Sequence, residues 1–598
     1  MTTMSSARPR EVNSWRAAAI LYGDWGTSKA YVLGLAFALA SYSSFWFIFA
    51  VSILTLLVGS SYIIICKLYP NGGGVYASAR EHSKVLSVIS AFFLLADYLV
   101  TAALSALAAF HYLDVAHPEY WAICSIGLIG ILNFLGPKNT GSMAIALAIP
   151  TLIIVVCLGM LSLPFISEAI HNLPWPHKTI GEDWNIFVGI IVALSGIEAI
   201  ANMTGSMKLD PGSTIRQPSV AKTSTPAIIM VMLEVCIFTS LFGLAMNALP
   251  GLEISGDDVN APGFPNVRDA MLRYMGQIFS GSLFGPVVGT IFSFIISIVI
   301  TLLLLSAVNT ALVALISLLF IVSRDGELPE YFQKLNRFGV PIYPTLIAFL
   351  LPMGLLLFVS DVRGLANLYA VGFVGAIAVN LGATSINMKL IIKPWQRFFM
   401  FATFIIMTLI ELSLFIDKPE ARNFVFAIMT FGLFLRTFVI EGKEKKTIAE
   451  TPARALLPEP PKDLSGGLLV AVQGINKALD YALDESEVYN VPLHILFIRE
   501  QKVTTDKDNQ SLWGDDQEAC KVFDYVIARG NKNLISFLYT ISSHVTHSLT
   551  EIAKEKNVKK VIIGRRKGPH FLLNFIRGTS PQSIFRHMPK EIDLIVIY

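Results

Sequence analysis

The sequence predicts an all-α membrane protein of twelve transmembrane helices, followed by a soluble α/β domain. The composition supports this, because the 598 residues are 54% hydrophobic and only 15% charged, with a mean hydropathy of +0.60. Such values are typical of multi-spanning membrane proteins and exclude a soluble enzyme. The order of the parts is the second observation, since long apolar runs stop near residue 440 and short alternating runs follow.

Twelve apolar segments have about the length that a membrane helix needs to cross ~30 Å of hydrocarbon. They lie at residues 17–39, 43–67, 86–112, 119–135, 142–166, 184–204, 224–249, 280–320, 343–360, 365–388, 396–416 and 421–440. Together they define a membrane domain over residues 17–440, preceded by a basic arm, residues 1–16, without a signal-peptide cleavage pattern. With the amino terminus inside, most loop Lys and Arg residues lie on the inner side. Both termini are therefore expected in the cytoplasm and the protein in the cell membrane.

An aspartate lies inside the first apolar segment, within Tyr22-Gly23-Asp24-Trp25-Gly26-Thr27-Ser28. A carboxylate inside the bilayer is costly unless something pairs with it, so it marks an ion or substrate pathway. Gly23 and Gly26 are expected to break the helix and to leave backbone carbonyls free beside Asp24. A carboxylate and free carbonyls together suit a bare monovalent cation.

A second apolar segment is also interrupted, because residues 184–204 contain Ser195-Gly196-Ile197-Glu198. Broken helices at corresponding places of two halves indicate an inverted repeat with its binding site at the membrane midplane. A passive channel is less well supported, since no repeated carbonyl-ring filter sequence is visible. Two more acids in apolar spans, Glu234 and Glu411, match no motif and are expected to be structural or coupling residues.

Residues 15–440 resemble the amino acid–polyamine–organocation superfamily, whose fold is like that of the LeuT transporters. The resemblance is carried by Pro-Asn-Gly-Gly-Gly-Val-Tyr at residues 70–76 and Ser-Arg-Asp-Gly-Glu-Leu-Pro at residues 323–329. Residues 22–28 followed by Tyr31 resemble the YGDIGTSPLY motif of the KUP potassium uptake permeases. Twelve helices followed by a cytoplasmic α/β domain is an order similar to that of the KimA-type potassium importers.

These resemblances imply a potassium site, with potassium as the only metal. The matching residues are Asp24, Tyr31, Asp97, Tyr98, Thr101, Ser195 and Tyr369, with Glu198 for proton coupling or gating. Helical spacing places Asp97 with Thr101, and Ser195 with Glu198, on one helix face each. The oxygen-only set suits a hard, dehydrated cation. Because several carboxylates around one monovalent ion cannot all stay charged cheaply, at least one is expected to carry a proton.

One residue departs from the KUP motif, because Lys29 stands where that motif has proline. Its ammonium could neutralise Asp24, which would weaken a potassium site and favour proton coupling of an organic substrate. It could also snorkel outward and matter little. The sequence thus predicts a secondary active importer of potassium by proton symport, with Lys29 as a candidate coupling residue. The alternative is a proton-coupled amino acid or amine permease, and a sensor that no longer transports is the least supported reading.

The soluble part begins after a charged, proline-rich stretch at residues 441–463 that predicts a semi-rigid linker. Residues 464–598 alternate β-rich runs at 468–472, 493–498, 558–563 and 592–598 with amphipathic helical stretches, the clearest of which is residues 534–556. This alternation predicts a small parallel α/β sheet.

The soluble domain resembles the universal stress protein family. Its glycine-and-hydroxyl nucleotide pattern is matched by Gly564, Gly568, Gly578 and Thr579, with one residue too many between the first two glycines. Gln473 also stands where nucleotide-binding members have an aspartate. A dimerising regulatory module that binds a nucleotide weakly or not at all is therefore as well supported as an ATP site. No cofactor is required. The expected partners are potassium, protons, the lipid bilayer and a second copy of the chain, with no nucleic acid.

Overall fold

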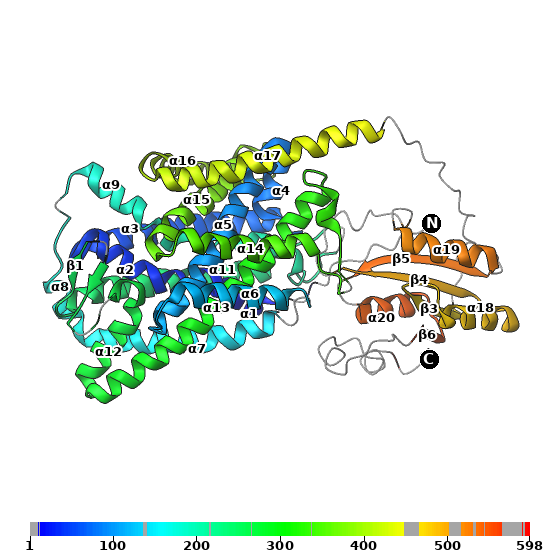
Figure 1. Cartoon of the computed structure of the whole chain (residues 1–598), viewed down its shortest axis with the longest axis horizontal. Coiled ribbons are helices and arrows are strands. Elements are labelled where there is room, and N and C mark those ends of the chain that lie inside the picture. Colours follow the sequence, from blue (N-terminus) through cyan, green and yellow to red (C-terminus); the bar gives the residue numbers. More distant parts are fainter. Residues whose placement is uncertain are drawn as a thin grey trace. The chain divides into compact units, whose positions relative to one another are not determined.

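A computed structural model describes residues 10–597 except 11, 136–139, 177, 215–216, 257, 263, 265, 337, 448–465, 502–512, 514–515, 530–533, 543–544, 565–588 and 590–591. The chain divides into two compact units. The first, here called the membrane unit, is Arg10–Lys334 with Pro341–Glu444, and the second, the α/β unit, contains Leu335–Val340 and Lys445–Tyr598. Figure 1 shows the first as a bundle of helices and the second as a sheet with flanking helices.

In the part of the membrane unit that the structure describes, helices predominate and one short hairpin is present. Its α-helices are α1 (Ser14–Trp25), α2 (Ser28–Ala40), α3 (Ser44–Leu68), α4 (Gly74–Arg80), α5 (Lys84–Tyr112), α6 (Pro118–Asn133), α7 (Thr140–Ser162), α8 (Ile166–His171), α9 (Ile180–Gly189), α10 (Glu198–Met203), α11 (Ala221–Ala245), α12 (Met271–Phe284), α13 (Pro286–Arg324), α14 (Ile342–Phe358), α15 (Val362–Ile386), α16 (Pro394–Asp417) and α17 (Pro419–Thr447). Short 3-10 turns include η3 (Ile191–Leu194), η4 (Thr204–Ser206) and η6 (Val267–Ala270). Strands β1 (Glu253–Ser255) and β2 (Asp258–Asn260) pair antiparallel.

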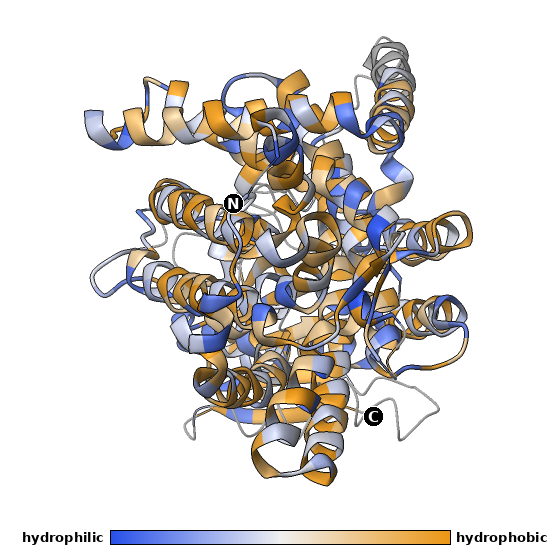
Figure 2. Cartoon of the chain, turned by 90° about the vertical axis from the view of Figure 1, so that its left-hand side faces the viewer, coloured by the Kyte–Doolittle hydropathy of each residue, from blue (hydrophilic) through white to orange (hydrophobic). Residues whose placement is uncertain are grey.

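Within the described residues, seven helical segments are long and apolar enough to cross a membrane. The number is eight if the bent pair Ile180–Gly189 and Ile191–Ser206, which meet at 44°, counts as one span. One of the seven is the segment Ser14–Leu68, which contains α1, α2 and α3, and Ile342–Phe358 is a shorter apolar helix. Figure 2 shows hydrophobic residues, in orange, along most of these helices. A multi-span helical membrane unit is thus confirmed, while the number of twelve spans stays a prediction.

The first helix is broken, but at one glycine and not at two. Gly23 lies inside α1, whereas Gly26 and Thr27 form the turn before α2. The carbonyl of Asp24 accepts hydrogen bonds from the Thr27 amide and hydroxyl, and the Trp25 carbonyl accepts from Ser28 Oγ at 2.8 Å. The hydroxyls of Thr27 and Ser28 thus replace helical hydrogen bonds that the turn removes at Asp24 and Trp25, while free carbonyls at Gly23 and Gly26 stay a prediction.

Helices α5 and α15 form the centre of the membrane unit. Their apolar windows are 83% buried, more than those of the other spanning segments. Helix α5 packs against α13 and α15, while α1 packs against α11 and α7. Side chains in the middle of α5 and α15 are therefore shielded from the surroundings by other helices.

The α/β unit contains a five-stranded parallel sheet, as predicted, in the order β5-β4-β3-β6-β7. The strands are β3 (Leu468–Val472), β4 (Leu493–Glu500), β5 (Ile535–Ser542), β6 (Lys560–Gly564) and β7 (Asp593–Ile597), and the helices are α18 (Lys477–Tyr489), α19 (Gln517–Arg529) and α20 (Val545–Glu555). Alternate residues of the strands enter two separate apolar cores, one with α18 and α19 and one with α20. Helices therefore cover both faces of the sheet.

Two boundaries differ from those that the sequence predicts. The stretch 534–556 is not one helix, since Ile535–Ser542 is strand β5 and only Val545–Glu555 is helical. The strand is rich in β-branched and aromatic residues, and its parallel pairing with β4 satisfies its backbone. Helix α17 continues to Thr447, so the first residues of the predicted linker are helical. The resemblance of this unit to universal stress proteins stays a prediction.

Candidate functional site

All eight residues that the resemblance assigns to the ion site are buried in the membrane unit. Their relative exposures range from 0% for Asp97 to 8% for Asp24, and the set is Asp24, Tyr31, Asp97, Tyr98, Thr101, Ser195, Glu198 and Tyr369. They come from four places in the fold, namely the break between α1 and α2, the middle of α5, the start of α10 and the middle of α15.

Two glycines allow these elements to approach one another. Gly196 has φ +96°, and a Cβ built on it would lie 2.7 Å from the Trp25 amide nitrogen. The non-helical stretch between η3 and α10 therefore lies directly against the end of α1, next to Asp24. A Cβ on Gly372 of α15 would lie 2.8 Å from the Asp97 amide nitrogen. At both positions only glycine leaves room for the neighbouring backbone.

These approaches bring three carboxyl groups, those of Asp24, Asp97 and Glu198, into mutual electrostatic contact. Asp97 and Glu198 interact electrostatically with each other as well as with Asp24. Asp97 Oδ2 and Glu198 Oε2 are otherwise buried without a partner among the described residues. Within the same residues, no Lys, Arg or His forms an ion pair with any of the three acids. We call these three residues the acid cluster.

Hydroxyl groups surround the acid cluster. Tyr31 lies beside Ser195 and Thr27 and close to Asp24 and Asp97. Ser195 Oγ has no hydrogen-bond partner among the described residues, although the residue is buried. Oxygen is therefore the ligand type that this region offers to a cation.

The remaining predicted residues are Tyr369, Tyr98 and Thr101, which lie near the acid cluster. Tyr369 of α15 is close to all three acids and to Tyr31. The Tyr98 hydroxyl accepts a hydrogen bond from Asn202 Nδ2. Thr101 Oγ1 donates to the Asp97 carbonyl at 2.8 Å and lies 3.4 Å from Asp97 Oδ1. Thr101 therefore supports Asp97 and keeps its hydroxyl turned towards its own helix.

The three acids do not converge on one point. Among the described residues, no group of three His, Cys, Asp or Glu is placed to hold a metal ion. A cation in this region would be bound by one or two carboxylates together with hydroxyl oxygens. That arrangement suits a weakly held monovalent ion, whereas a divalent ion usually collects six or more oxygens.

Sequence reasoning missed a chain of buried polar side chains close to Glu198. Tyr62 of α3 is fully buried and close to Glu198 and Asp97. Its hydroxyl accepts from Asn380 Nδ2 at 3.4 Å, and Asn380 Oδ1 accepts from Ser78 Oγ at 2.7 Å. A buried amide in an apolar span is itself a signal of a functional or packing contact, so Asn380 could have been found. Tyr62 carries no such signal.

Comparison with known proteins identifies the family of the membrane unit. The amino acid permease family model matches residues 12–440. The chain belongs to the amino acid permease family. It is also 26% identical over 539 residues to the "Potassium transporter KimA" of Bacillus subtilis (strain 168), with 84% of this chain and 82% of that protein covered. This permease is thus a multi-pass membrane protein of a transporter family.

Lys29 of this permease neither neutralises Asp24 nor snorkels. Its side chain is 1% exposed, and Nζ lies 2.8 Å from both carboxylate oxygens of Glu234. Both interpretations of Lys29 from the sequence are therefore wrong, because packing against α11 supplies a nearer acid. Glu411 of α16 does not share this arrangement, since both of its buried oxygens are without a partner among the described residues.

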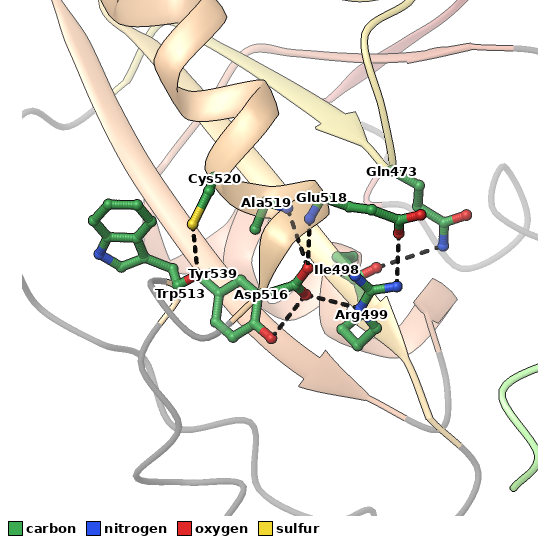
Figure 3. Close-up of polar contacts among 9 residues, drawn as sticks. All are labelled: Gln473, Ile498, Arg499, Trp513, Asp516, Glu518, Ala519, Cys520 and Tyr539. Atoms are coloured by element: carbon green, nitrogen blue, oxygen red, sulfur yellow. Dashed lines mark hydrogen bonds and ion pairs between the residues drawn. The ribbon is translucent and has the colours of Figure 1, made fainter. Parts of the chain in front are cut away.

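The predicted nucleotide site of the permease lies largely outside the described residues, which include Gly564 at the exposed end of β6 but not Gly568, Gly578 or Thr579. Near the carboxyl ends of β3 and β4, where parallel sheets commonly bind ligands, Figure 3 shows a polar network. Arg499 Nε donates to Asp516 Oδ2 at 2.8 Å and Nη1 donates to Glu518 at 2.8 Å. The side-chain Nε2 of Gln473 donates a hydrogen bond to the Ile498 carbonyl at 3.5 Å.

Asp516 is the centre of that network. It also accepts a hydrogen bond from the Tyr539 hydroxyl at 3.1 Å and from the Ala519 amide at 3.2 Å. Burial alone would raise the pKa of Asp516, but the hydrogen bonds from Arg499 and Ala519 outweigh it and lower that pKa below its ordinary value. The guanidinium of Arg499 is thus paired with acids of its own domain.

Proposed function

We propose that this permease is a secondary active transporter that imports potassium ions by proton symport across the cell membrane. The observation that carries the proposal is the acid cluster, in which three buried carboxyls interact electrostatically with no ion-paired base among the described residues. Buried negative charge of this kind must be compensated by a bound cation, by protons or by both. The similarity to a potassium transporter of Bacillus subtilis supports potassium as that cation.

The geometry suggests a division of roles. Asp24, at the break of the first helix, supplies the counter-charge, while the hydroxyls of Tyr31, Ser195 and Tyr369 replace part of the hydration shell of the ion. Asp97 and Glu198 hold one proton between them, because two neighbouring buried carboxylates cannot both be charged cheaply. Movement of the two broken segments, which touch at Gly196, would open the site to one side at a time.

Proton-coupled transport of an amino acid or amine is the second candidate. The family model of the membrane unit favours it, because its description is that of an amino acid permease. The pairing of Lys29 with Glu234 removes the main sequence argument for it, since the ammonium does not occupy the position beside Asp24.

A regulatory role for the α/β unit is part of the same proposal. Its resemblance to universal stress proteins supports a module that pairs two copies of the chain and responds to a nucleotide, which transport itself would not require. The termini would lie in the cytoplasm, as the distribution of Lys and Arg in the loops indicates.

Uptake by the purified protein in liposomes tests the proposal. We expect uptake of rubidium, as a tracer for potassium, to be driven by an inward proton gradient and to fall when a protonophore collapses that gradient. Amino acid uptake without rubidium uptake would establish the second candidate instead. Rubidium flux that ignores the proton gradient would show a facilitator and exclude symport.

A further inference from the structure

A second buried charge cluster lies outside the acid cluster. The Lys29 ammonium bonds both oxygens of Glu234 at 2.8 Å, and the side chains are 1% and 10% exposed. The Tyr22 hydroxyl donates to Glu234 Oε1 at 3.0 Å and lies 3.4 Å from the Lys29 nitrogen. That nitrogen also lies 4.8 Å from the centre of the Tyr22 ring. All three polar groups thus contact one another.

The three side chains come from three helices that the broken segment joins. Tyr22 belongs to α1 and Lys29 to α2, on opposite sides of the turn at Gly26 and Thr27. Glu234 lies near the middle of α11, which packs against α1, α2 and α3. One carboxylate therefore holds both halves of the broken helix on a neighbouring helix. Asp24 lies in the chain between the two points of attachment.

This arrangement is poorly explained as a device for stability alone. Removing two charges from water costs roughly as much as their attraction returns, and replacing a buried pair by apolar residues is often neutral or stabilising. What such a pair does provide is a defined geometry, because both oxygens of Glu234 are used by directional donors. The geometry that it defines is that of the turn beside Asp24.

We propose that Glu234 is a positioning residue for the cation site. Through Lys29 and Tyr22 it fixes α1 and α2 on α11, so that Asp24 is held against the Gly196 stretch. The same pairing keeps the Lys29 ammonium from competing with the transported cation for Asp24. This inference rests on the proposed function and adds Glu234, Lys29 and Tyr22 to it as residues that act through Asp24.

The test compares substrate KM with maximal rate in four variants of the full-length protein in liposomes. Glu234→Gln is expected to raise the rubidium KM about ten- to a hundredfold, as small displacements of a binding group do. Tyr22→Phe keeps both charges and the ring, and a few-fold rise is expected. Lys29→Glu combined with Glu234→Lys restores the ion pair and should return KM towards the wild-type value. Lys29→Met combined with Glu234→Gln removes both charges, and its KM should stay raised although the protein is as stable as the wild type.

Glu327→Gln is the matched control. Its carboxylate pairs with Arg436 of α17, and the two side chains are 10% and 19% exposed. Loss of this pair is expected to lower the thermal unfolding temperature without changing KM. Glu234→Gln and Tyr22→Phe proteins that fold and keep the wild-type KM would overturn the inference, and so would a charge-swapped protein that folds but keeps a raised KM. If Glu234→Gln does not fold, Tyr22→Phe decides. If the wild type carries an amino acid and no rubidium, the proposed function fails, and the same KM comparison with that amino acid still tests the positioning role.

Discussion

The buried acids of this permease fall into different kinds according to their surroundings. The acid cluster combines Asp24 with Asp97 and Glu198. The carboxylate of Glu234 instead pairs with the Lys29 ammonium and accepts a hydrogen bond from the Tyr22 hydroxyl. An acid in an apolar span therefore predicts a functional or paired site, but the sequence does not say which of the two.

Neutralising Asp24 tests the counter-charge role. In Asp24→Asn the shape of the side chain is kept while its charge is lost, so we expect rubidium uptake to fall ~100-fold or more, because removing a counter-charge inside the membrane leaves the ion uncompensated. Thermal unfolding of the purified variant should stay near that of the wild type. Glu411→Gln is the matched control, because Glu411 is buried on α16 and both its oxygens lack a partner among the described residues. It should transport normally, and near-normal flux in Asp24→Asn would contradict the assignment.

Two short breaks and two unbroken helices, α5 and α15, position the residues of the predicted site. The break in the first helix is confined to Gly26 and Thr27, and the second break places Ser195 in an extended conformation beside Gly196 at φ +96°. The two breaks touch each other. An interruption of the helical pattern in the sequence predicts such places, but only packing shows which glycine is indispensable.

The glycines differ in their tolerance of a side chain. Gly196→Ala would place a Cβ 2.7 Å from the Trp25 amide nitrogen and force a residue with a side chain into φ +96°. We therefore expect the free energy of unfolding to fall by about 1–3 kcal/mol and transport to be lost. Gly23→Ala is the control, because nothing lies within 4 Å of its Cβ and the residue is helical. That variant should keep transport and gain about 0.5–1 kcal/mol of stability. Unfolding and uptake measurements on both proteins check this, and equal behaviour would contradict the close approach at Gly196.

At the scale of the whole molecule, the chain combines two units whose interiors differ in composition. The membrane unit encloses a small number of buried polar groups among the apolar side chains of its helices, whereas the α/β unit has two apolar cores on the faces of a parallel sheet. Outside these cores, the Arg499 and Asp516 network ties β4 to the start of α19. Because these contacts lower the pKa of Asp516, we expect the stability of the α/β unit to depend on pH.

Asp516→Asn is expected to destabilise the α/β unit by about 2 kcal/mol at neutral pH, since hydrogen bonds to a charged group are lost. Because the pKa of Asp516 lies below the unfolded value of about 4, its stabilising contribution is complete above that pH. The contribution disappears as the pH falls through the folded-state pKa, so wild type and variant should converge in acid. Hydrogen exchange of the β4 and β5 peptides in the full-length protein, compared at each pH, measures this. A difference in stability between wild type and Asp516→Asn that stays constant from pH 7 to about 3 would exclude the Asp516 carboxylate as the source of that difference.

The sequence by itself determined the class of this protein, the interruptions at Gly26 and Gly196, and the parallel sheet of the soluble part. It did so because hydropathy and periodicity are local properties that a few neighbouring residues reveal. It also named Asp24, Asp97 and Glu198 as unusual, since an acid in an apolar span is costly wherever it lies. The functions of those acids remain predictions.

Only the tertiary structure decided the partners of those residues. Lys29 and Glu234 are separated by 205 residues, and Tyr62 meets Asn380 across 318. The strand at Ile535–Ser542 likewise became recognisable only beside β4. Ion pairs and strand pairing depend on which distant segments packing brings together, and no local pattern contains that information. The choice of Glu234 over Asp24 as the partner of Lys29 is therefore a property of the fold.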